Sequence, residues 1–396
     1  MIPLILVLNC GSSSIKFALF DMSTPTIARQ PSWHGKVDGI GSPQASYGDS
    51  QQAQEAVPLD SARPYHSALS VIRARVRAYL SDTQRIACVA HRVVHGGSKY
   101  FAPVRMDAQV LADLKSYIPL APLHQPFALE AIEELFATEP DLPQIACFDT
   151  AFHRTQAPIE QMLALPWSVW ERGVRRYGFH GLSYEYMSHA LPERHGELAN
   201  GRVIVAHLGN GASLCALQSL QSVATTMGFS ALDGLMMGSR CGSIDPGAVI
   251  YLMQIEKLSL EAVAHMLYHD SGLRGVSGIS GDPRDLLPIE GHNPRASAAL
   301  ALYVRRIVRE IGALTAVLGG LDLLVFTAGI GEHSNVLRAR ICQDLSWLGL
   351  HLDAEANARH AAVISTPDSP VTVGVEKTNE EWIAAWHSAR LLATAA

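Results

Sequence analysis

The feature that most constrains this chain is a strand, a turn and a second strand near its start. The apolar run Leu4–Leu8 predicts a buried strand that ends at Asn9. A glycine- and serine-rich turn at 11–14 leads into a second apolar strand, which contains Lys16 and ends at Asp21. Glycine permits close backbone approach, hydroxyls donate hydrogen bonds and lysine adds positive charge. The segment fits either a β-hairpin with a serine-rich turn or a cradle for phosphate oxygens.

The same design recurs in the second half of the chain. An apolar strand at 203–206 leads into the glycine-rich turn His207–Ser213, and a returning strand follows at 214–217. A third glycine turn, at 328–332, follows a predicted buried strand at 323–327. Turns of this kind bring backbone close to a nucleotide. Their order predicts two similarly built halves, each with a turn that faces phosphate.

Strand-like and helix-like segments alternate along the rest of the chain, which predicts an α/β fold. The polar stretch 41–56 is expected to be a surface loop, and Ser183 is expected to be a helix N-cap. The other expected elements are a helix over 67–80, a strand over 86–90, a helix from Pro126, a strand over 145–148, and a long helix from Pro294 to Gly319.

Composition excludes several classes of protein. The 396 residues are 48% hydrophobic and 17% charged with a net charge of −6, which argues against a nucleic-acid or membrane-surface partner. The six cysteines have no C-x-x-C spacing and are expected to be reduced thiols. The first ten residues lack the positive region and the apolar length of a signal peptide. We therefore expect a cytoplasmic protein.

A set of motifs gives the chain a family resemblance. It has no G-x-x-x-x-G-K-[ST] loop, so a nucleotide would be bound by several separate turns. The motifs, in chain order, are NCGSSSIK at 9–16, HRVVHGG at 91–97, APLH at 121–124, FDTAFH at 148–153, YGFHG at 177–181, HLGNG at 207–211, MMGSR at 236–240, IDPG at 244–247, FTAGIG at 326–331 and TNEE at 378–381. In these motifs the chain resembles the acetate kinase family, within the actin/Hsp70/sugar-kinase superfamily.

The resemblance implies an architecture. It predicts two actin-like (RNase H-like) α/β domains with mixed sheets flanked by helices, and an active site in the interdomain cleft. The first domain would span 1–150 and be joined by the C-terminal helix at 379–396, and the second would span 151–378 and carry most of the nucleotide site. A homodimer and a role in acetyl-CoA biosynthesis are implied in the same way.

The implied reaction is reversible Mg²⁺-dependent phosphoryl transfer between ATP and acetate. A carboxylate is already ionised at neutral pH, so the main demand is to bring two anions together and to neutralise charge on the phosphoryl group. Arginine suits this task because its planar fork binds carboxylate or phosphate. By resemblance, Arg92 binds the acyl substrate and Arg240 stabilises the transition state, although a lone arginine is more commonly a surface ion-pair partner.

Further site residues follow from the motifs. His180 would donate to the phosphoryl oxygens, and Asp149 would be the active-site acid that positions an arginine or the substrate. His124 is open between a second donor and a structural histidine. The acyl pocket is expected to be formed by Arg92 and His124 with Val94, Leu123, Phe179 and Ala231.

The resemblance also implies a nucleotide and a metal. Asn9 and Glu380 match metal-associated positions for Mg²⁺, or for Mn²⁺ as a substitute, and the neighbouring Glu381 points elsewhere on a helix. The ATP/ADP contacts are expected to come from Ser12, Ser14, Lys16, His207, Leu208, Gly209, Asn210, Gly211, Asp282, Pro283, Arg284, Gly329, Ile330, Gly331, Glu332 and His333.

Four positions depart from the family pattern. Ala231 stands where proline is usual in the acyl pocket, and its smaller side chain predicts a wider pocket that also admits propionate. Ser98 replaces a frequent glutamate. Pro283 and His333 replace residues usual near the base, which leaves purine preference open.

Two other functions are weighed beside acetate kinase. A propionate kinase would use the same mechanism with a wider pocket. A nucleotide-switched binding module of the same fold would need neither Arg92 nor an apolar pocket around Phe179. The expected substrates are small molecules, acetate or propionate with ATP.

Overall fold

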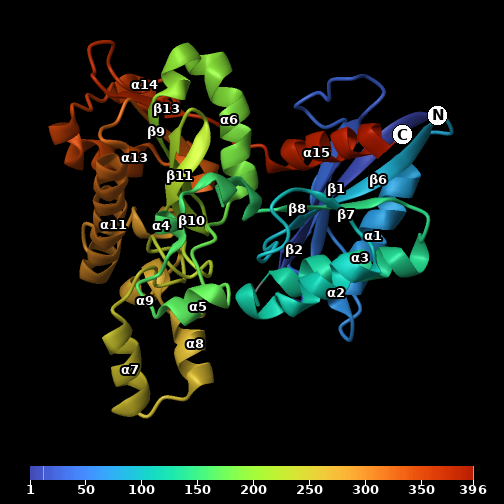
Figure 1. The fold of residues 1–396 in the computed structure, drawn as a ribbon, viewed down its shortest axis with the longest axis horizontal. Coiled ribbons are helices and arrows are strands. Elements are labelled where there is room, and N and C mark those ends of the chain that lie inside the picture. The colour runs from blue at the N-terminus through green and yellow to red at the C-terminus, as the bar shows by residue number, and fades with distance from the viewer. Residues whose placement is uncertain (12, 123, 396) are drawn as a thin grey trace. The chain divides into compact units, whose positions relative to one another are not determined.

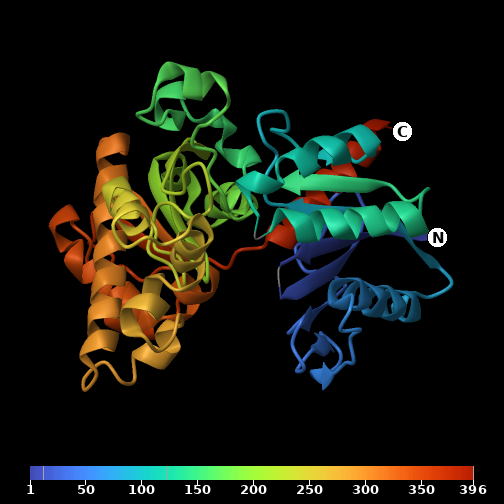
Figure 2. The same cartoon turned by 90° about the horizontal axis from the view of Figure 1, so that it is seen from below.

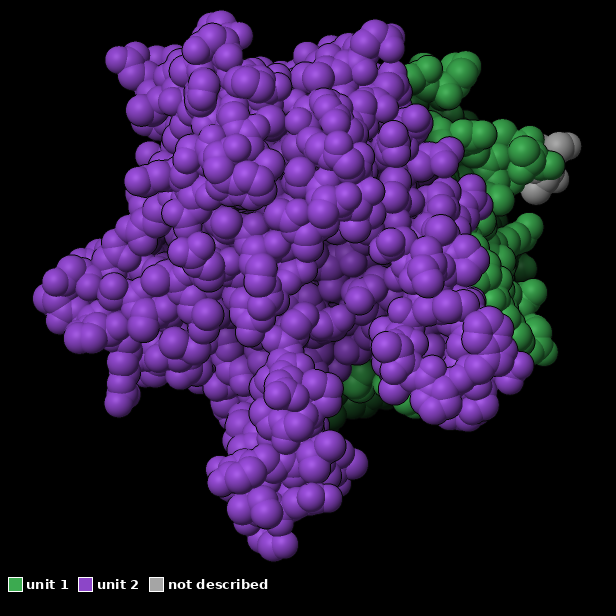
Figure 3. Space-filling view, turned by 60° about the vertical axis from the view of Figure 1, so that its left-hand side comes forward, with its two compact units in different colours: residues 1–151, 379–396 green, residues 152–378 purple. Residues whose placement is uncertain are grey.

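The chain forms two compact units, distinguished by colour in Figure 3: residues 1–151 with 379–396 (unit 1), and residues 152–378 (unit 2). The computed structural model describes residues 1–11, 13–122 and 124–395, so the predicted roles of Ser12 and Leu123 lie outside the described residues. Each unit contains a mixed sheet flanked by helices, which confirms the predicted fold class. Among the described residues, helices long and apolar enough to cross a membrane are absent.

Unit 1 is built on an eight-stranded sheet with the order β5-β4-β3-β2-β1-β6-β8-β7. Its central strands β1, β6 and β8 are parallel, whereas β2 runs antiparallel to β1. The strands are β1 (Ile2–Cys10), β2 (Ser14–Asp21), β3 (Trp33–Asp38), β4 (Ser46–Asp49), β5 (Glu55–Ala56), β6 (Gln84–Val93), β7 (Val104–Arg105) and β8 (Gln144–Phe148). Parallel central strands place their carboxyl ends along one edge, and this edge positions the functional groups of unit 1.

Helices cover both faces of the unit 1 sheet, as Figures 1 and 2 show. The helices are α1 (Pro64–Tyr79), α2 (Ala108–Ser116), α3 (Gln125–Thr138) and α15 (Glu380–Ala395). Side chains of a strand alternate between faces, so Leu6 and Leu8 of β1 pack with Ile72 of α1 and Ile132 of α3 in one core. On the other face α15 contacts β1, β6 and β8. The last helix of the chain therefore completes the core of the first unit.

Unit 2 is built on a five-stranded sheet with the order β11-β10-β9-β12-β13. The strands are β9 (Arg202–Leu208), β10 (Ala212–Gln218), β11 (Gln221–Thr225), β12 (Leu323–Thr327) and β13 (Thr372–Val375). β9 and β10 form the predicted strand-turn-strand, and β12 runs parallel to β9. The carboxyl ends of β9 and β12 therefore carry both predicted glycine segments of this unit.

The longest helix of unit 2, α11 (Pro294–Leu318), packs on β9 and β10, and α6 (Gly181–His195) lies on the opposite side of the sheet (Figure 1). The other helical segments are α4 (Pro158–Gln161), α5 (Trp167–Glu171), α7 (Pro246–Gln254), α8 (Leu260–His269), α9 (Gly272–Ser277), α10 (Pro283–Leu286), α12 (Ala328–His333), α13 (Asn335–Asp344), α14 (Ala354–Ala358), and the 3₁₀ turns at 118–120, 151–155, 196–200 and 346–348. α11 begins at the predicted Pro294 and ends at Gly319, which adopts the left-handed conformation.

Three local predictions were wrong. The stretch 41–56, expected to be a loop, contains β4 and β5, because backbone pairing at a sheet edge does not need an apolar sequence. The segment 328–332, expected to be a glycine turn, belongs to α12, where the Glu332 carboxylate accepts a hydrogen bond from the Ala328 amide at 2.9 Å. Ser183 is not an N-cap, because α6 starts after His180.

Candidate active site

The functional groups of unit 1 lie at the carboxyl ends of its three parallel strands. Asn9 of β1 is the register partner of Arg92 of β6, and Asp149 directly follows β8. Glu380, the first residue of α15, lies beside them. The parallel pairing of the sheet brings together Asn9, Arg92 and Asp149, and the start of α15 adds Glu380 to them.

Arg92 is the centre of this group. Its Nε lies 3.0 and 3.1 Å from the two carboxylate oxygens of Asp149, and its Nη2 donates to Asp149 Oδ2 at 2.6 Å. Its Nη1 donates to Asn9 Oδ1 at 3.1 Å and lies 3.6 Å from Glu380 Oε2. Such bidentate pairing fixes the plane of the guanidinium. Arg92 is therefore held rigidly by oxygen atoms on three sides.

Burial governs the electrostatics of this pair. Burial lowers the pKa of Arg92, but the attraction of Asp149 and Glu380 outweighs it, so the pKa lies above its ordinary value. Burial raises the pKa of Asp149, against the opposing effect of Arg92. With only 1% of its side chain exposed, Asp149 needs the guanidinium to compensate its charge. Asp149 is thus placed to orient Arg92.

The oxygen atoms of this cluster fit a magnesium ion. Asn9 Oδ1 and Glu380 Oε2 lie 3.1 and 3.6 Å from the same atom, Arg92 Nη1, so an amide and a carboxylate oxygen lie close to each other beside the guanidinium. Mg²⁺ prefers oxygen ligands, keeps several waters and uses few protein groups. In the described part of the chain, clusters of three or more His, Cys, Asp or Glu side chains that could hold a metal are absent. Asn9 and Glu380 therefore suit a metal held mainly by water and phosphate.

The other predicted residues of unit 1 have separate positions. Ser14 begins β2 and accepts, through its carbonyl, a hydrogen bond from the Gly11 amide at 2.9 Å. Lys16 lies exposed on β2, and Val94 is buried just after β6. His124 is the N-cap residue of α3, and its backbone amide bonds Ala121.

His180 is held in a strained backbone conformation in unit 2. Its φ is 57°, a left-handed value that costs a non-glycine residue about 1–3 kcal/mol. The preceding Gly178 has φ 74°, and a Cβ there would lie 2.5 Å from the ring of His153. Strain of this size persists only where the surroundings enforce it. The turn thus presents the His180 ring at the start of α6.

Hydroxyl groups and a second ring orient His180. Its Nδ1 lies 2.8 Å from Ser213 Oγ, which also bonds the Tyr184 hydroxyl at 2.5 Å. The ring stacks on His207 with centroids 4.1 Å apart. His207 is anchored through Nδ1 to Ser183 Oγ at 2.9 Å. Because Nδ1 of His180 is bonded to Ser213, the ring nitrogen that faces the glycine turn at Gly211 is Nε2.

His153 supports the same turn from below. Its Nε2 donates to the Phe179 carbonyl at 2.9 Å, and its Nδ1 accepts from Ser222 Oγ at 2.8 Å, which suits a neutral ring. Burial lowers the pKa of His153 to about 4. A neutral His153 therefore fixes the backbone between Phe179 and His180.

The side chains of His180 and Arg240 converge on the glycine turn between β9 and β10. A Cβ on Gly211 would lie 3.2 Å from His180 Nε2 and 3.6 Å from Arg240 Nη1. A side chain at position 211 would therefore fill the space that these two groups face. Two donors aimed at one open point above a backbone turn suit a phosphoryl group.

Arg240 differs from Arg92 in its partners. Its Nη1 donates to the backbone carbonyl of Ala231 at 2.9 Å and lies 3.7 Å from Met237 Sδ. Among the described residues, no carboxylate forms an ion pair with Arg240, and burial lowers its pKa below the ordinary value. The positive charge of Arg240 is thus left uncompensated within unit 2.

Three segments expected to contact nucleotide meet around this turn. A Cβ on Gly238 would lie 2.9 Å from Asn210 Oδ1 and 3.0 Å from the Gly281 carbonyl, next to Asp282. A Cβ on Gly209 would lie 3.7 Å from the Cβ of Ala328 at the start of α12. The structure therefore brings the predicted segments 207–211, 282–284 and 329–333 into one neighbourhood.

The outer members of these segments make local contacts. Asp282 caps α10 and pairs with Arg284, whose Nη2 lies 2.6 Å from Asp282 Oδ2, and Pro283 is buried at the helix start. His333 is exposed and lies 3.9 Å from Glu332. Glu332 also accepts from the Thr378 amide at 3.2 Å.

Sequence reasoning missed several supporting residues. Arg338 is fully buried and donates to the carbonyls of Gly331 and Glu332 at 2.7 and 2.8 Å, which satisfies the end of α12. Its pKa is lowered to about 10 by burial. Ser213 is the last residue of the turn 207–213 that the sequence predicted, but no motif marks its hydroxyl for this role. Ser183 was named for the wrong role, since it anchors His207.

Comparisons with known proteins identify the family of the chain. The model of the Acetokinase family matches residues 4–386. The acetate kinase of Rhodopseudomonas palustris is 47% identical over 396 residues, covering 99% of both chains, and that of Nitrobacter hamburgensis is 48% identical over 395 residues, covering 98% of this chain and 96% of the relative.

Solved structures of acetate and propionate kinases also match the chain over nearly its full length. An acetate kinase from Porphyromonas gingivalis matches with a TM-score of 0.85 at 34% identity, covering 98% of this chain and 100% of that one. A propionate kinase from Francisella tularensis matches with a TM-score of 0.87 at 33% identity, covering 97% and 98%. On the full-length family match and the identity to these relatives, the chain belongs to the acetokinase family.

Proposed function

We propose that this protein is an acetate kinase, which transfers a phosphoryl group reversibly between ATP and acetate. The observation that carries the chemistry is the convergence of His180 Nε2 and Arg240 Nη1 on the open face of Gly211. The choice of acetate is supported by relatives at 47% and 48% identity that are named acetate kinases. The matching propionate kinase is less similar, at 33% identity.

In the proposed step, a carboxylate oxygen of acetate forms a bond to the γ-phosphorus of ATP. The bond from that phosphorus to the β,γ-bridging oxygen breaks, and its electron pair leaves with ADP. Acetate is already ionised, so no proton has to be removed by the protein. The chain must instead bind two anions in line and stabilise the charge on the equatorial oxygens.

The roles proposed for the side chains follow from their partners. Arg92, oriented by Asp149, binds the acetate carboxylate. Arg240 and His180 donate to the transferring phosphoryl group, and the uncompensated charge of Arg240 favours an anion there. Val94, Phe179 and Ala231 contribute apolar surface for the methyl group.

ATP and Mg²⁺ are the proposed co-substrate and cofactor. The backbone turns at 207–211, 282–284 and 329–333 would hold the nucleotide, with Lys16 and Ser14 as further contacts. Asn9 and Glu380 would hold Mg²⁺, which neutralises phosphate charge when bound. The proposal thus assigns the acyl and metal groups to an N-terminal domain, 1–150 with the last helix, and most of the nucleotide site to 151–378.

A homodimer is also proposed, through α7 and the start of α8. All residues of α7 are exposed or half-buried, and Ile250, Tyr251, Ile255 and Leu260 are each more than half exposed. Apolar clusters of this kind mark interaction sites. Light scattering of the purified protein should give twice the monomer mass, and a monomer mass at micromolar concentration would contradict the dimer.

We propose a cytoplasmic location, which is supported by the six cysteines, since all of them are thiols outside any disulfide in the described part of the chain. Fractionation of the native cells should recover the protein with reducing-compartment markers.

The function is tested by incubating the purified protein with ATP, Mg²⁺ and acetate, and trapping the acyl phosphate with hydroxylamine. Acetyl hydroxamate should form in step with ADP. Acetate, propionate and butyrate are then compared by kcat/KM. If kcat/KM for propionate is at least tenfold higher than for acetate, propionate is the preferred substrate. ATP turnover without acyl phosphate would point to a nucleotide-switched module.

A further inference from the structure

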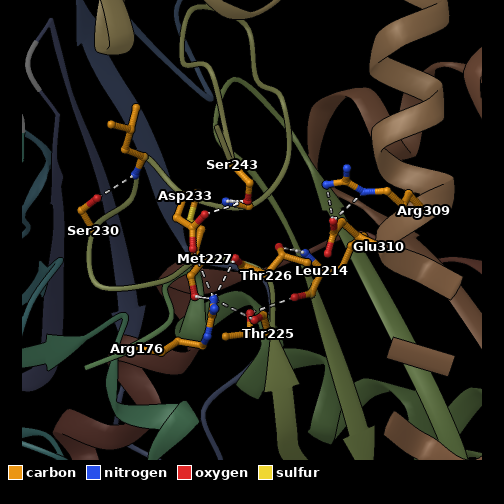
Figure 4. A network of polar contacts seen from close by, with 12 residues as sticks. Arg176, Leu214, Thr225, Thr226, Met227, Ser230, Asp233, Ser243, Arg309 and Glu310 are labelled. Atoms are coloured by element: carbon orange, nitrogen blue, oxygen red, sulfur yellow. Dashed lines mark hydrogen bonds and ion pairs between the residues drawn. The ribbon is translucent and has the colours of Figure 1, made fainter. Parts of the chain in front are cut away.

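Arg176 lies four residues before His180 and makes an unusual set of contacts, drawn in Figure 4. Its Nη1 lies 3.4, 3.1 and 3.1 Å from the successive backbone carbonyls of Thr225, Thr226 and Met227. The same nitrogen lies 3.5 Å from Asp233 Oδ2. One guanidinium nitrogen thus contacts the carbonyls at the point where the chain leaves β11 and the strand-to-strand hydrogen bonds end.

The carbonyls that Arg176 binds begin the loop 226–243, which carries both Ala231 and Arg240. Asp233 Oδ1 accepts from Ser243 Oγ at 2.7 Å, and Ser243 Oγ accepts from the Gly234 amide at 3.2 Å (Figure 4). The loop is therefore closed on itself through Asp233, the carboxylate that Arg176 also contacts. Arg176 touches both the beginning and the middle of this loop.

Backbone contacts also join the segment that contains Arg176 to this loop. The amides of Tyr177 and Gly178 both lie within hydrogen-bond distance of the Gly228 carbonyl, at 3.0 and 3.3 Å. Gly228 packs tightly here, because a Cβ on it would lie 2.4 Å from Asp233 Oδ2. The segment 176–180, which ends in His180, is thus joined to the loop 226–243 by both side chain and backbone.

A contact within the loop links Arg240 to this anchored segment. Arg240 Nη1 donates to the Ala231 carbonyl, and Ala231 lies between the points that Arg176 binds and Asp233. A shift of this loop would move the guanidinium of Arg240 and the Ala231 side chain together, while His180 would stay with α6. Misplacement of such groups by about 1 Å costs on the order of 10²-fold in rate.

We propose that Arg176 is a positioning residue, which with Asp233 sets the loop 226–243 in register with His180 and so aligns Arg240 and the acyl-pocket residue Ala231. This inference rests on the proposed function. Asp233 is 37% exposed and the ion-pair distance is long, so the carbonyl contacts, and not the charge pair, dominate. The position of Nη1, the one nitrogen that makes all of these contacts, should therefore matter more than the charge of the side chain.

The test uses Arg176→Gln, Arg176→Lys and Asp233→Asn in the full-length protein. For Arg176→Gln, kcat should fall about tenfold and the KM for acetate should rise about fivefold, while the KM for ATP stays unchanged. Arg176→Lys should restore less than half of the loss, because the lysine side chain is one bond shorter and its ammonium does not reach the position of Nη1. Asp233→Asn should have the smallest effect.

Arg202→Gln is the matched control. Arg202 also binds a backbone carbonyl, that of Gly319 at 2.9 Å, and a carboxylate, that of Asp322 at 3.0 Å, but at the opposite end of β9 from His207. Its variant should keep both KM values. If Arg176→Gln changes kcat only in proportion to its folded fraction, with both KM values as in the wild type, Arg176 is merely structural and the inference is overturned. Absence of acyl phosphate formation by the wild-type protein would instead overturn the proposed function.

Discussion

The two units hold an arginine in opposite ways. In unit 1, Arg92 is surrounded by Asp149, Asn9 and Glu380, and its pKa lies above the ordinary value. In unit 2, the partners of the Arg240 guanidinium among the described residues are a backbone carbonyl and a sulfur atom, and burial lowers its pKa. An arginine whose charge is compensated by carboxylates is held rigidly, and it can orient a substrate anion although the net positive charge around it is small. An uncompensated one has its full charge available where negative charge must be stabilised.

The sharpest way to break this comparison is to remove the uncompensated charge. Arg240→Ala should lower kcat by about 10³-fold or more, the range seen when an arginine that stabilises a phosphoryl transition state is lost. The KM for acetate should change little, since its proposed partner is the transition state. Initial rates over a matrix of acetate and ATP concentrations measure both. A change confined to KM would assign Arg240 to substrate binding instead.

The next largest effect should come from the compensated pair. Asp149→Asn leaves Arg92 with only the more distant Glu380 carboxylate, and breaking a buried pair typically costs about 3–5 kcal/mol. Urea unfolding monitored by fluorescence should show this loss. Glu133→Gln, which removes the exposed pair with Lys115, is the control and should leave the midpoint unchanged. Equal effects of both variants would show that burial of the pair is unimportant.

The proposed metal site sharpens the comparison further, because its two oxygen ligands, from Asn9 and Glu380, belong to unit 1. Glu380→Ala should raise the Mg²⁺ concentration for half-maximal activity about tenfold. The adjacent Glu381→Ala is the matched control, since neighbouring helical residues point in different directions. Identical Mg²⁺ titrations of the two variants would remove Glu380 from the metal site.

The last expected effect is on the pH dependence of stability, and it tests whether the units respond alike. Burial lowers the pKa of His91 in unit 1 and of His153 in unit 2 to about 4. The unfolded chain then binds protons below pH 6.5 that the folded chain refuses. Stability is therefore complete above about pH 6.5 and is lost as the pH falls toward 4, by about 1.4 kcal/mol per pH unit for each histidine.

Urea midpoints at pH 7 and pH 5 measure this loss. His91→Gln and His153→Gln should each show a smaller difference between the two pH values than the wild type. His265→Gln, at an exposed position, should behave like the wild type. A wild-type midpoint that is the same at both pH values would contradict the buried neutral state of these rings.

The sequence predicted much of the fold, because apolar runs and glycine punctuation are local signals. The helix from Pro294 to Gly319 and the strand Leu323–Thr327 were predicted at their observed bounds. The edge strands β4 and β5 were missed, because their pairing depends on backbone that any sequence can supply. The left-handed conformation of His180, the residue before α6, could not be predicted, because the sequence around it looks like that of an ordinary loop.

The candidate site could be predicted as a set of residues but not as a geometry. Parallel pairing of β1, β6 and β8 explains why Asn9, Arg92 and Asp149 meet, and that register is a property of the sheet. The supports of the site were missed, because Arg176 and Ser213 act through carbonyls and hydroxyls that no motif marks. The roles of the site residues stay predictions until the variants are measured.

The contact between Arg240 and position 231 has one more consequence. The acceptor is the main-chain oxygen of Ala231, and every amino acid, proline included, offers the same oxygen. The side chain there can therefore be exchanged, and the choice of carboxylic acid retuned, without removing the anchor of the guanidinium. In the proposed site, the side chain at position 231 affects which acid is accepted, and the carbonyl of the same residue anchors Arg240. The two properties can therefore change independently.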